Sequence, residues 1–382
     1  MKLTVCIPTY NRPELLPIAV ESILKDPTNP GLPIFVSSDS DPKYRTKELK
    51  RLKTLCNRGP SKIYYVDTER SEAYKTELQE KSGVSKEVVN IAINGGSAGA
   101  NRNRLLLLAC TYCADGVIFS DDDMKVEDDF IEYHDMALGN TVSQFVSKLK
   151  NFKRIPTSLS EELKQTGLEK TIEVFAAGWV FYDHVDDISY DVYFRKSENL
   201  FESIELNTAN LSLTNLVYST IPFPINIEME DYIFGKHVKK MLESMNGIVL
   251  KGSRSTSIHG DSTHTSSEKK FKEIRYLKRR GLSIVSTDVM ENLPTSHGKN
   301  FGKKMVKIIG QKIQNYGRSS EFQEELLEGK RIYRDRFNPK DIVDELKGIL
   351  HKNGILYQNW SDLTDAAKKI DSSVLEEFLV TK

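Results

Sequence analysis

Three consecutive carboxylates, Asp121, Asp122 and Asp123, follow an apolar run that has the character of a β-strand. Crowded like charges repel one another and resist desolvation, so a chain places them together only where water or a counter-charge screens them. Asp121 and Asp123 occupy alternate positions at the strand end, so both side chains can face one side of a sheet. A divalent cation between them and the phosphates of a ligand turns that repulsion into coordination, because Mg²⁺ and Mn²⁺ prefer hard oxygen ligands.

Two other interpretations compete with a metal site. An acidic turn that caps the next helix accounts for one aspartate but not for three. A phosphotransfer site with a nucleophilic aspartate also places D-x-D after a strand, but a small pair such as Gly-Thr normally follows, whereas Met124 and Lys125 follow here. The residues therefore favour a metal that is bound together with a phosphate-bearing ligand.

The elements that position these carboxylates alternate along the first two-thirds of the chain. We expect strands over residues 3–10, 33–41, 61–67, 88–94 and 116–124, a helix over 14–24 with Asn11 as its cap and Pro13 in its first turn, and a Gly-rich turn that opens a helix over 94–113. This alternation predicts an α/β fold with a mainly parallel sheet and helices on both faces. Ligands bind outside the carboxyl ends of such strands, and three ends carry polar residues, at 9–11, 37–41 and 121–123.

The second half of the chain has a looser pattern. Strands are expected within residues 172–185 and 203–219, and an acidic loop turns into a helix across 225–242. A Ser/Thr/Gly-rich loop and a basic helix follow, and the chain beyond residue 315 is predicted to be a charged, helical C-terminal appendage.

The charge of the chain is balanced overall but not locally. Lys+Arg and Asp+Glu both total 54, whereas residues 236–318 hold 18 basic and 6 acidic side chains. This asymmetry indicates either a basic surface for phosphates, anionic lipid or nucleic acid, or a solvated helical face. Residues 298–318 interleave lysines with apolar residues, so they either lie on an anionic membrane or pack as an ordinary amphipathic helix.

The four cysteines suit a reducing cytoplasm rather than a disulfide scaffold. Cys110 and Cys113 form a lone C-x-x-C with no second pair to complete a zinc site. The N-terminus lacks a secretory apolar core, and no apolar run reaches the length of a membrane span. We expect a cytoplasmic protein that is soluble, or peripheral at the inner face of a membrane.

Five segments in one order resemble a known family. They are VCIPTYNRPELLPIAVESIL, NGGSAGANRNRLL, FSDDDM, EMEDYIFGKHV and SIHGDST, and they span roughly residues 3 to 265. Together they resemble the nucleotide-sugar glycosyltransferases of the GT-A fold, especially the large, mostly inverting family-two group. The resemblance implies a GT-A domain over 1–265, divided into a nucleotide-sugar half (1–125) and an acceptor half (126–265), with 266–382 as a basic and then charged helical extension.

The resemblance also implies a role for each acidic residue. Asp123, with Asp121 and with His259 as third ligand, would hold Mn²⁺ or Mg²⁺ and neutralise the departing nucleoside diphosphate. His259 can instead be a surface histidine of its loop, and His264 is its substitute if the register differs. Asp231 corresponds to the family's catalytic base, with Glu230 as its reserve, although acidic residues at a helix start also stabilise the helix dipole.

The donor would be a nucleoside-diphosphate sugar. The residues implied for its binding are Pro8, Thr9, Tyr10, Arg12, Asp39, Asn94, Gly96, Arg102, Asp121 and Asp122, the last for ribose or sugar hydroxyls. After the second strand the chain reads Ser-Ser-Asp-Ser-Asp in place of the family's Asp-Asp-Gly-Ser type of pattern, which leaves the nucleobase open. UDP is expected because it is the commonest nucleotide in the family.

The acceptor and the stereochemistry stay open at this point. A glycan, a glycolipid, a protein side chain or a modified nucleobase can each serve as acceptor, and no residue pattern indicates an oligomeric state. A retaining GT-A glycosyltransferase and a non-catalytic module that binds nucleotide sugars or nucleic acid are the two alternatives to an inverting enzyme.

Overall fold

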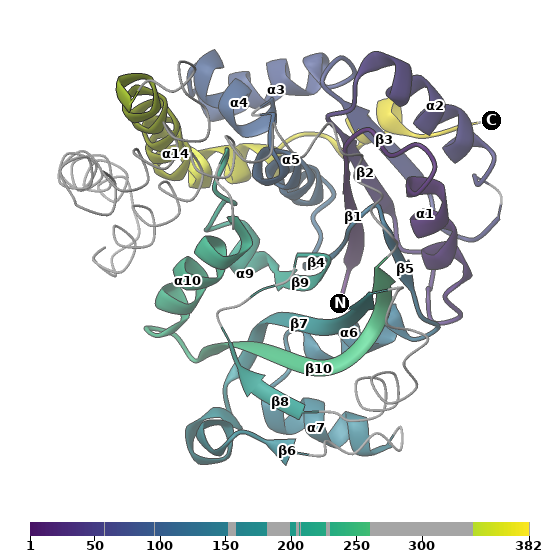
Figure 1. Cartoon of the computed structure of the whole chain (residues 1–382), viewed down its shortest axis with the longest axis vertical. Coiled ribbons are helices and arrows are strands. Elements are labelled where there is room, and N and C mark those ends of the chain that lie inside the picture. The colour runs from purple at the N-terminus through teal and green to yellow at the C-terminus, as the bar shows by residue number, and fades with distance from the viewer. Residues whose placement is uncertain are drawn as a thin grey trace.

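The computed structural model describes residues 1–56, 58–94, 96–151, 158–181, 199–203, 206, 208–226, 230–259 and 339–381. Within them, ten strands form one sheet in the order β3-β2-β1-β4-β9-β7-β10-β8-β6, with β5 paired to β10 (Figure 1). The strands are β1 Leu3–Thr9, β2 Ile34–Ser38, β3 Ile63–Asp67, β4 Gly116–Ser120, β5 Met124–Val126, β6 Ser158–Leu159, β7 Thr171–Phe181, β8 Asn199–Glu202, β9 Asn210–Thr214 and β10 Gly247–His259.

The helices flank this sheet (Figure 1). They are α1 Leu16–Lys25, α2 Pro42–Lys53, α3 Glu72–Ser82, α4 Lys86–Ile93, α5 Ala98–Thr111, α6 Phe130–Ala137, α7 Val142–Asn151, α9 Asn215–Tyr218, α10 Glu230–Leu242 and α14 Pro339–Ala367, with a π-helical turn at Leu163–Gly167 and a 3₁₀ helix at Ser372–Phe378.

The predicted α/β architecture is confirmed. β3, β2, β1 and β4 are parallel neighbours, and β7 is parallel to β10, whereas β9 is antiparallel to both β4 and β7. The carboxyl ends of the first four strands therefore meet at one edge of the sheet. Thr9 lies opposite Ser38, and Ser38 lies opposite Asp67, so the polar residues that follow these strands begin side by side.

Strands β1 to β4 are each buried on both faces, which explains their continuous apolar sequences. In β1, Val5 and Ile7 pack with α1 and α2, whereas Cys6 packs on the opposite side with α5. This alternation is the two-residue period of a strand. The second half has its own apolar cluster, in which Tyr133 and Phe145 of α6 and α7 pack against β7 and β10.

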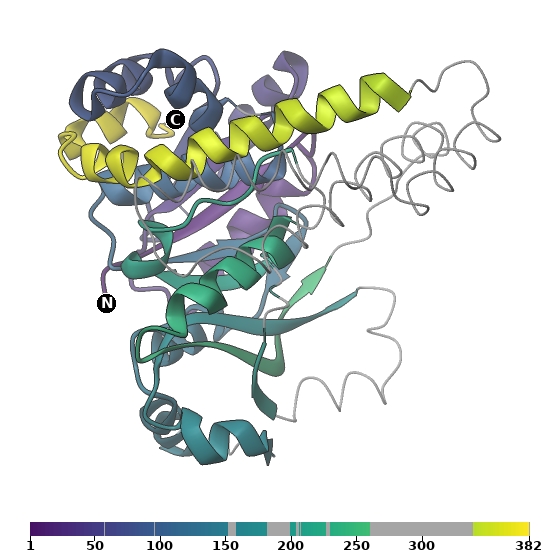
Figure 2. The ribbon, with the colours of Figure 1, turned by 90° about the vertical axis from the view of Figure 1, so that its left-hand side faces the viewer.

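The C-terminal residues belong to the same core as the first half of the sheet. α14 runs along α3, α4 and α5 (Figures 1 and 2). Trp360 is fully buried there and donates from Nε1 to the Tyr218 carbonyl at 3.0 Å. After the 3₁₀ helix, Val380 donates its amide to the Ile63 carbonyl at 2.9 Å, so the chain end covers the outer edge of β3.

Three sequence predictions about elements are corrected. Residues 88–94, predicted as a strand, lie mostly in helix α4, which Ser85 caps through the Val88 amide; a short, fully buried apolar run has the same composition in either element. The helix predicted from Asn11 begins at Leu16, because Asn11 adopts a left-handed φ of 56° and ties the β1 loop to Asp41. β4 ends at Ser120, so the three aspartates lie in a turn and strand alternation does not orient them.

Among the helices within the described ranges, none combines the length and the apolar character that crossing a membrane requires. All four cysteines are described, and each is a free thiol.

Candidate active site

The acidic turn after β4 faces the end of β1. Arg12 places one nitrogen, Nη1, against two carboxylates: it donates to Asp122 Oδ1 at 2.9 Å and to Asp123 Oδ2. Thr9 Oγ1 donates to Asp122 Oδ2 at 2.6 Å. Burial raises the pKa of Asp122 to about 7, and the positive charge of Arg12 opposes that rise. Asp122 and Asp123 are thus arranged around a single cationic atom.

Asp121 points to a different arginine. Arg102, which is nearly fully buried on α5, donates from Nη2 to Asp121 Oδ1 at 3.2 Å and from Nη1 to Glu230 Oε1 at 2.5 Å. Burial by itself lowers the pKa of Arg102, but the negative charges of Asp121, Glu230 and Asp231 raise it above its ordinary value. One guanidinium therefore joins the aspartate turn to the start of α10, where both predicted catalytic carboxylates lie.

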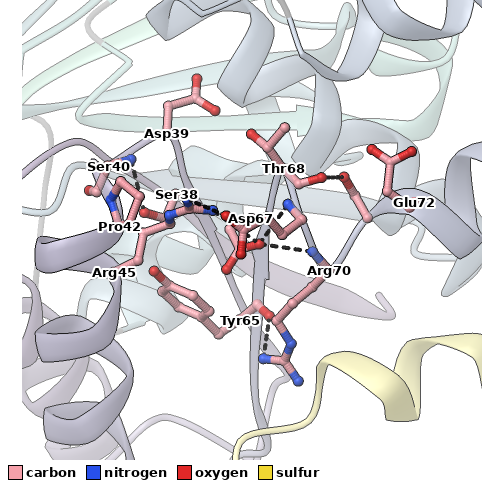
Figure 3. A network of polar contacts seen from close by, with 12 residues as sticks. Ser38, Asp39, Ser40, Pro42, Arg45, Tyr65, Asp67, Thr68, Arg70 and Glu72 are labelled. Atoms are coloured by element: carbon pink, nitrogen blue, oxygen red, sulfur yellow. Dashed lines mark hydrogen bonds and ion pairs between the residues drawn. The ribbon is translucent and has the colours of Figure 1, made fainter.

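Asp39, at the end of β2, is held by a third arginine. Arg104 has no exposed surface and donates from Nη2 to Asp39 Oδ1 at 2.6 Å. The other oxygen, Oδ2, is buried and accepts no hydrogen bond from any residue within the described ranges. Figure 3 shows Asp39 directed away from the neighbouring network in which Arg45 contacts Asp67.

The remaining predicted donor-binding residues line the same edge. Tyr10 is 61% exposed at the end of β1, whereas Pro8 is buried within that strand opposite Ser37. Gly96, between α4 and α5, has a left-handed φ of 61°, and a Cβ built on it meets no atom within 4 Å. Asn94 ends α4, and its Oδ1 is buried without a hydrogen-bond partner among the described residues.

The predicted third metal ligand is placed only through its backbone. β10 pairs antiparallel with β5, and residue 259 lies opposite Met124, the neighbour of Asp123. The side chain of His259, and the whole of His264, lie outside what the structure describes. The described side chains contain no group of three or more His, Cys, Asp and Glu suited to hold a metal ion. Asp122 and Asp123 supply two carboxylates that meet at Arg12 Nη1, and carboxylate oxygens are the ligands that a hard cation prefers.

Sequence reasoning overlooked Arg104 and Asn103. Asn103 bridges α5 to the segment before α10: its Nδ2 donates to the Phe223 carbonyl at 2.8 Å, and its Oδ1 accepts from the Phe223 amide at 2.7 Å. The available signal was the run Asn-Arg-Asn-Arg directly before four leucines. Four polar side chains at the start of a buried helix must all find partners.

No protein-family model and no curated protein sequence matches the chain. Among solved structures, TarS 1–349 of S. aureus in complex with UDP has a TM-score of 0.42 and 14% identity, over 97% of this chain and 92% of that chain. Glucosyl-3-phosphoglycerate synthase of Mycobacterium tuberculosis in complex with Mg²⁺ and UDP has a TM-score of 0.39 and 12% identity, over 76% and 80%. At TM-scores this low, the likeness does not bear on the ligand or reaction of this chain.

Proposed function

We propose that this chain is a metal-dependent glycosyltransferase that moves a sugar from a nucleoside-diphosphate sugar, with UDP as the favoured nucleotide, to an acceptor hydroxyl with inversion. One observation carries the proposal: carboxylates from the ends of β2 and β4 and from the start of α10 gather at one edge of a parallel sheet, each held by an arginine. Open α/β sheets bind their ligands at that edge. The ordered motifs resembling family-two enzymes support a sugar nucleotide as the ligand.

The nucleotide would be recognised by residues of β1, β2 and the α4–α5 turn. Asp39 offers the buried acceptor Oδ2 to the base, and the exposed ring of Tyr10 offers a stacking surface. Gly96 allows the backbone to approach the ligand closely. Arg12 and Arg102 supply positive charge for the diphosphate, as arginines suit phosphate oxygens.

Asp123, with Asp121 and His259, is the ligand set proposed for Mn²⁺ or Mg²⁺. Asp122 Oδ1 and Asp123 Oδ2 converge on Arg12, so a cation that replaced this guanidinium would meet oxygens of both residues, which supports a cation position beside Asp123. Asp121 accepts a hydrogen bond from Arg102 instead, so it would have to release that arginine to join Asp123 on the metal. When bound, the metal would neutralise the charge that develops on the leaving nucleoside diphosphate.

Asp231 is the proposed general base, which takes the proton of the acceptor hydroxyl as that oxygen attacks the sugar. It lies in the first turn of α10, half-buried, beside the Arg102–Glu230 ion pair. Glu230 is engaged by Arg102 at 2.5 Å, so its carboxylate already has a structural partner. The position of Asp231 in the motif that resembles the family's Glu-Asp pair favours it as the base, and the contact with Arg102 makes Glu230 the residue that ties α10 to α5.

Several finer points belong to the same proposal. The cysteine content supports the proposal of a cytoplasmic location, and the proposed membrane-surface contact would involve residues 298–318, which lie outside the described ranges. The acceptor class is unassigned among glycan, glycolipid, protein and modified nucleobase. The anomeric configuration of the product, read by NMR, would separate inverting from retaining transfer.

Thermal unfolding tests the proposal directly. A ligand that binds only the native state raises the melting temperature, so UDP with Mn²⁺ is expected to stabilise the wild type more than either alone. GDP, CMP and dTDP serve as competitors, and Asp123→Ala should lose the metal-dependent part of the shift. Asp128→Ala, a nearby exposed aspartate, is the matched control and should respond like the wild type. If no nucleotide moves the melting temperature of the wild type, the chain does not bind such a donor and the proposal fails.

A further inference from the structure

Arg104 is a charged side chain with no exposed surface, and it has a complete set of partners. Its Nε and Nη2 donate to the Ile93 carbonyl at 3.0 and 2.7 Å, and its Nη1 donates to Ser37 Oγ at 3.1 Å and to the Ser38 carbonyl at 3.3 Å. Its carboxylate partner is Asp39, through Nη2 and Oδ1 at 2.6 Å. The guanidinium therefore joins the end of β2 to the end of α4.

This arrangement determines which oxygen of Asp39 is left without a hydrogen-bond partner among the described residues. A guanidinium is planar and rigid, and contacts on three sides fix its orientation, so the carboxylate that it binds is fixed as well. Oδ1 is occupied by Arg104, and Oδ2 is the buried oxygen that accepts no hydrogen bond from a described residue. The Asp39 amide donates to the Thr9 carbonyl at 3.2 Å, which anchors the backbone of the same residue.

We propose that Arg104 is the positioning residue that sets the base specificity of this site: it holds Asp39 so that a single carboxylate oxygen is presented to a base with one ring N–H between two carbonyls. This inference rests on the proposed function, because it assigns the base of the nucleotide that the site would take. Arg104 acts through Asp39 and does not itself touch the ligand.

The chemistry of the bases explains the expected selectivity. Uracil offers one N3–H, which matches one acceptor oxygen. Cytosine has a lone pair at N3, which in the same position would face Oδ2 and repel it, and its nearest donor is the N4 amino group at the ring edge, so the match to a single oxygen is lost. Guanine offers two adjacent donors, N1–H and N2–H, and pairs best with a carboxylate whose two oxygens are both available. With Oδ1 held by Arg104, uracil is the base that fits.

The experiment measures binding of UDP and of N3-methyl-UDP to the full-length protein by titration calorimetry in the presence of Mn²⁺. The methyl group removes the N3–H and changes little else. The wild type is expected to prefer UDP by about tenfold or more, as for loss of a hydrogen bond to a charged group. Arg104→Lys keeps the charge but not the planar fork, and it should reduce this ratio to about threefold or less.

Arg45→Lys is the matched control. Arg45 lies at the same edge of the sheet but pairs with Asp67 (Figure 3). It also pairs with Glu69 and has no contact with Asp39 among its ion pairs, so its substitution should leave the ratio unchanged. A purely structural role for Arg104 would weaken both ligands equally and keep the ratio at its wild-type value, which would overturn the inference. Equal binding of the two ligands by the wild type would overturn it too.

A second variant tests the same role of Arg104. If Arg104→Lys does not fold, Ser37→Ala removes one anchor of the guanidinium and leaves its charge in place; it should lower the ratio in the same direction, and an unchanged ratio would count against the inference. If the wild type binds neither ligand nor any other nucleoside diphosphate, the proposed function itself fails, and this outcome is distinct from binding without selectivity.

Discussion

At the level of single residues, the acidic edge of the sheet is stable because arginines are interleaved with its carboxylates. Arg12 lies between Asp122 and Asp123, and Arg102 lies between Asp121 and Glu230. Removing either arginine would leave buried negative charges without compensation, which costs far more than the net value of an ion pair. The same pattern means that a bound cation or diphosphate would compete with these internal partners.

Asp231→Asn is expected to lower kcat by about 10² to 10⁴, because it removes the group that would accept the proton of the acceptor. The KM for the donor and the stabilisation by UDP with Mn²⁺ should stay close to wild type, since Asp231 does not contact the nucleotide in the proposed arrangement. Steady-state kinetics with a UDP-sugar checks the first expectation, and thermal unfolding checks the second.

Glu230→Gln distinguishes the proposed role of Asp231 as the base from the role of Glu230 as the partner of Arg102. Glu230 is bound by Arg102, so its substitution should lower stability and affect kcat less than Asp231→Asn does. A kcat for Asp231→Asn within a few-fold of wild type, or a larger loss in Glu230→Gln, would rule out Asp231 as the base.

At the level of elements, a buried histidine joins α6 to β9. His134 has no exposed surface; its Nδ1 pairs with Ser212 Oγ at 2.9 Å and its Nε2 with Asn210 Oδ1 at 2.8 Å. Asn210 then donates to the Gly178 carbonyl of β7 at 2.7 Å and to Ser257 Oγ of β10 at 3.0 Å. This chain of hydrogen bonds fixes β10, whose last residue lies opposite the neighbour of Asp123.

We expect His134 to make the protein sensitive to acid. Burial lowers its pKa from the ordinary 6.5 to about 4, so between these values the unfolded chain binds more protons than the native one. The free energy of unfolding should therefore fall as pH decreases across this window, by up to about 1.4 kcal/mol per pH unit from this group. Urea denaturation at several pH values between 4 and 7.5 measures it.

His134→Gln provides the comparison, because Asp122 contributes with the opposite sign. Burial raises the pKa of Asp122 from 3.8 to about 7, so its contribution to stability decreases as pH rises across that range. The informative quantity is the difference in the free energy of unfolding between wild type and His134→Gln, which should become smaller as pH falls from 6.5 towards 4. A difference that does not change with pH would show that His134 is not held neutral.

The contact between α5 and the segment before α10 requires glycine at position 99. A Cβ on Gly99 would overlap the Pro224 carbonyl oxygen, and these backbone atoms cannot accommodate it without moving. Gly99→Ala is expected to lower the free energy of unfolding by about 2 kcal/mol or more and to weaken nucleotide binding, since α5 carries Arg102 and Arg104. Chemical denaturation and calorimetry with UDP measure the two effects.

Gly348→Ala is the matched control for that substitution. Gly348 lies in α14, and a Cβ added to it would have no atom within 4 Å, so alanine there should stabilise the helix by about 0.5 to 1 kcal/mol. If both substitutions change stability in the same direction and by the same amount, close packing at Gly99 is not the cause.

At the level of the whole molecule, the C-terminal helix is part of the domain that it follows in sequence. Trp360 packs in the same apolar cluster as α3, α4 and α5, and Asn353 both accepts from the Ile225 amide at 2.8 Å and donates to the Ile225 carbonyl at 3.0 Å. Ile225 lies shortly before α10 in the chain. α14 therefore supports both the core around α3, α4 and α5 and the segment that leads into α10.

Trp360→Ala is expected to lower the free energy of unfolding by about 3 to 5 kcal/mol, because it removes a fully buried indole and its hydrogen bond. The variant should still unfold in a single cooperative transition in urea, since α14 shares one core with the sheet. Lys352→Ala, an exposed position on the same helix, is the control and should change stability by about 0.5 kcal/mol or less. Loss of α14 in a separate, earlier transition would instead identify it as an independent unit.

The sequence alone determined the local features of this protein, because they depend on neighbouring residues. Alternating apolar strands and helices predicted the α/β sheet, and polar residues after the strands ending at Thr9, Ser38 and Ser120 predicted the edge at which the charged side chains gather. Local pattern failed at residues 88–94, where an apolar run is compatible with a strand or a buried helix and only its packing against α5 decides.

Only the tertiary structure determined which arginine pairs with which carboxylate. From the sequence, Arg12 could have bound a phosphate, and no pattern identified Arg104 as a site residue. The fold pairs Arg12 with Asp122 and Asp123, and it pairs Arg104 with Asp39. These pairs join segments far apart in the chain, and their geometry depends on the register between strands rather than on spacing along one of them. The partner of a buried charge depends on which opposite charges folding brings close to it. The order of residues along the chain does not show which these will be.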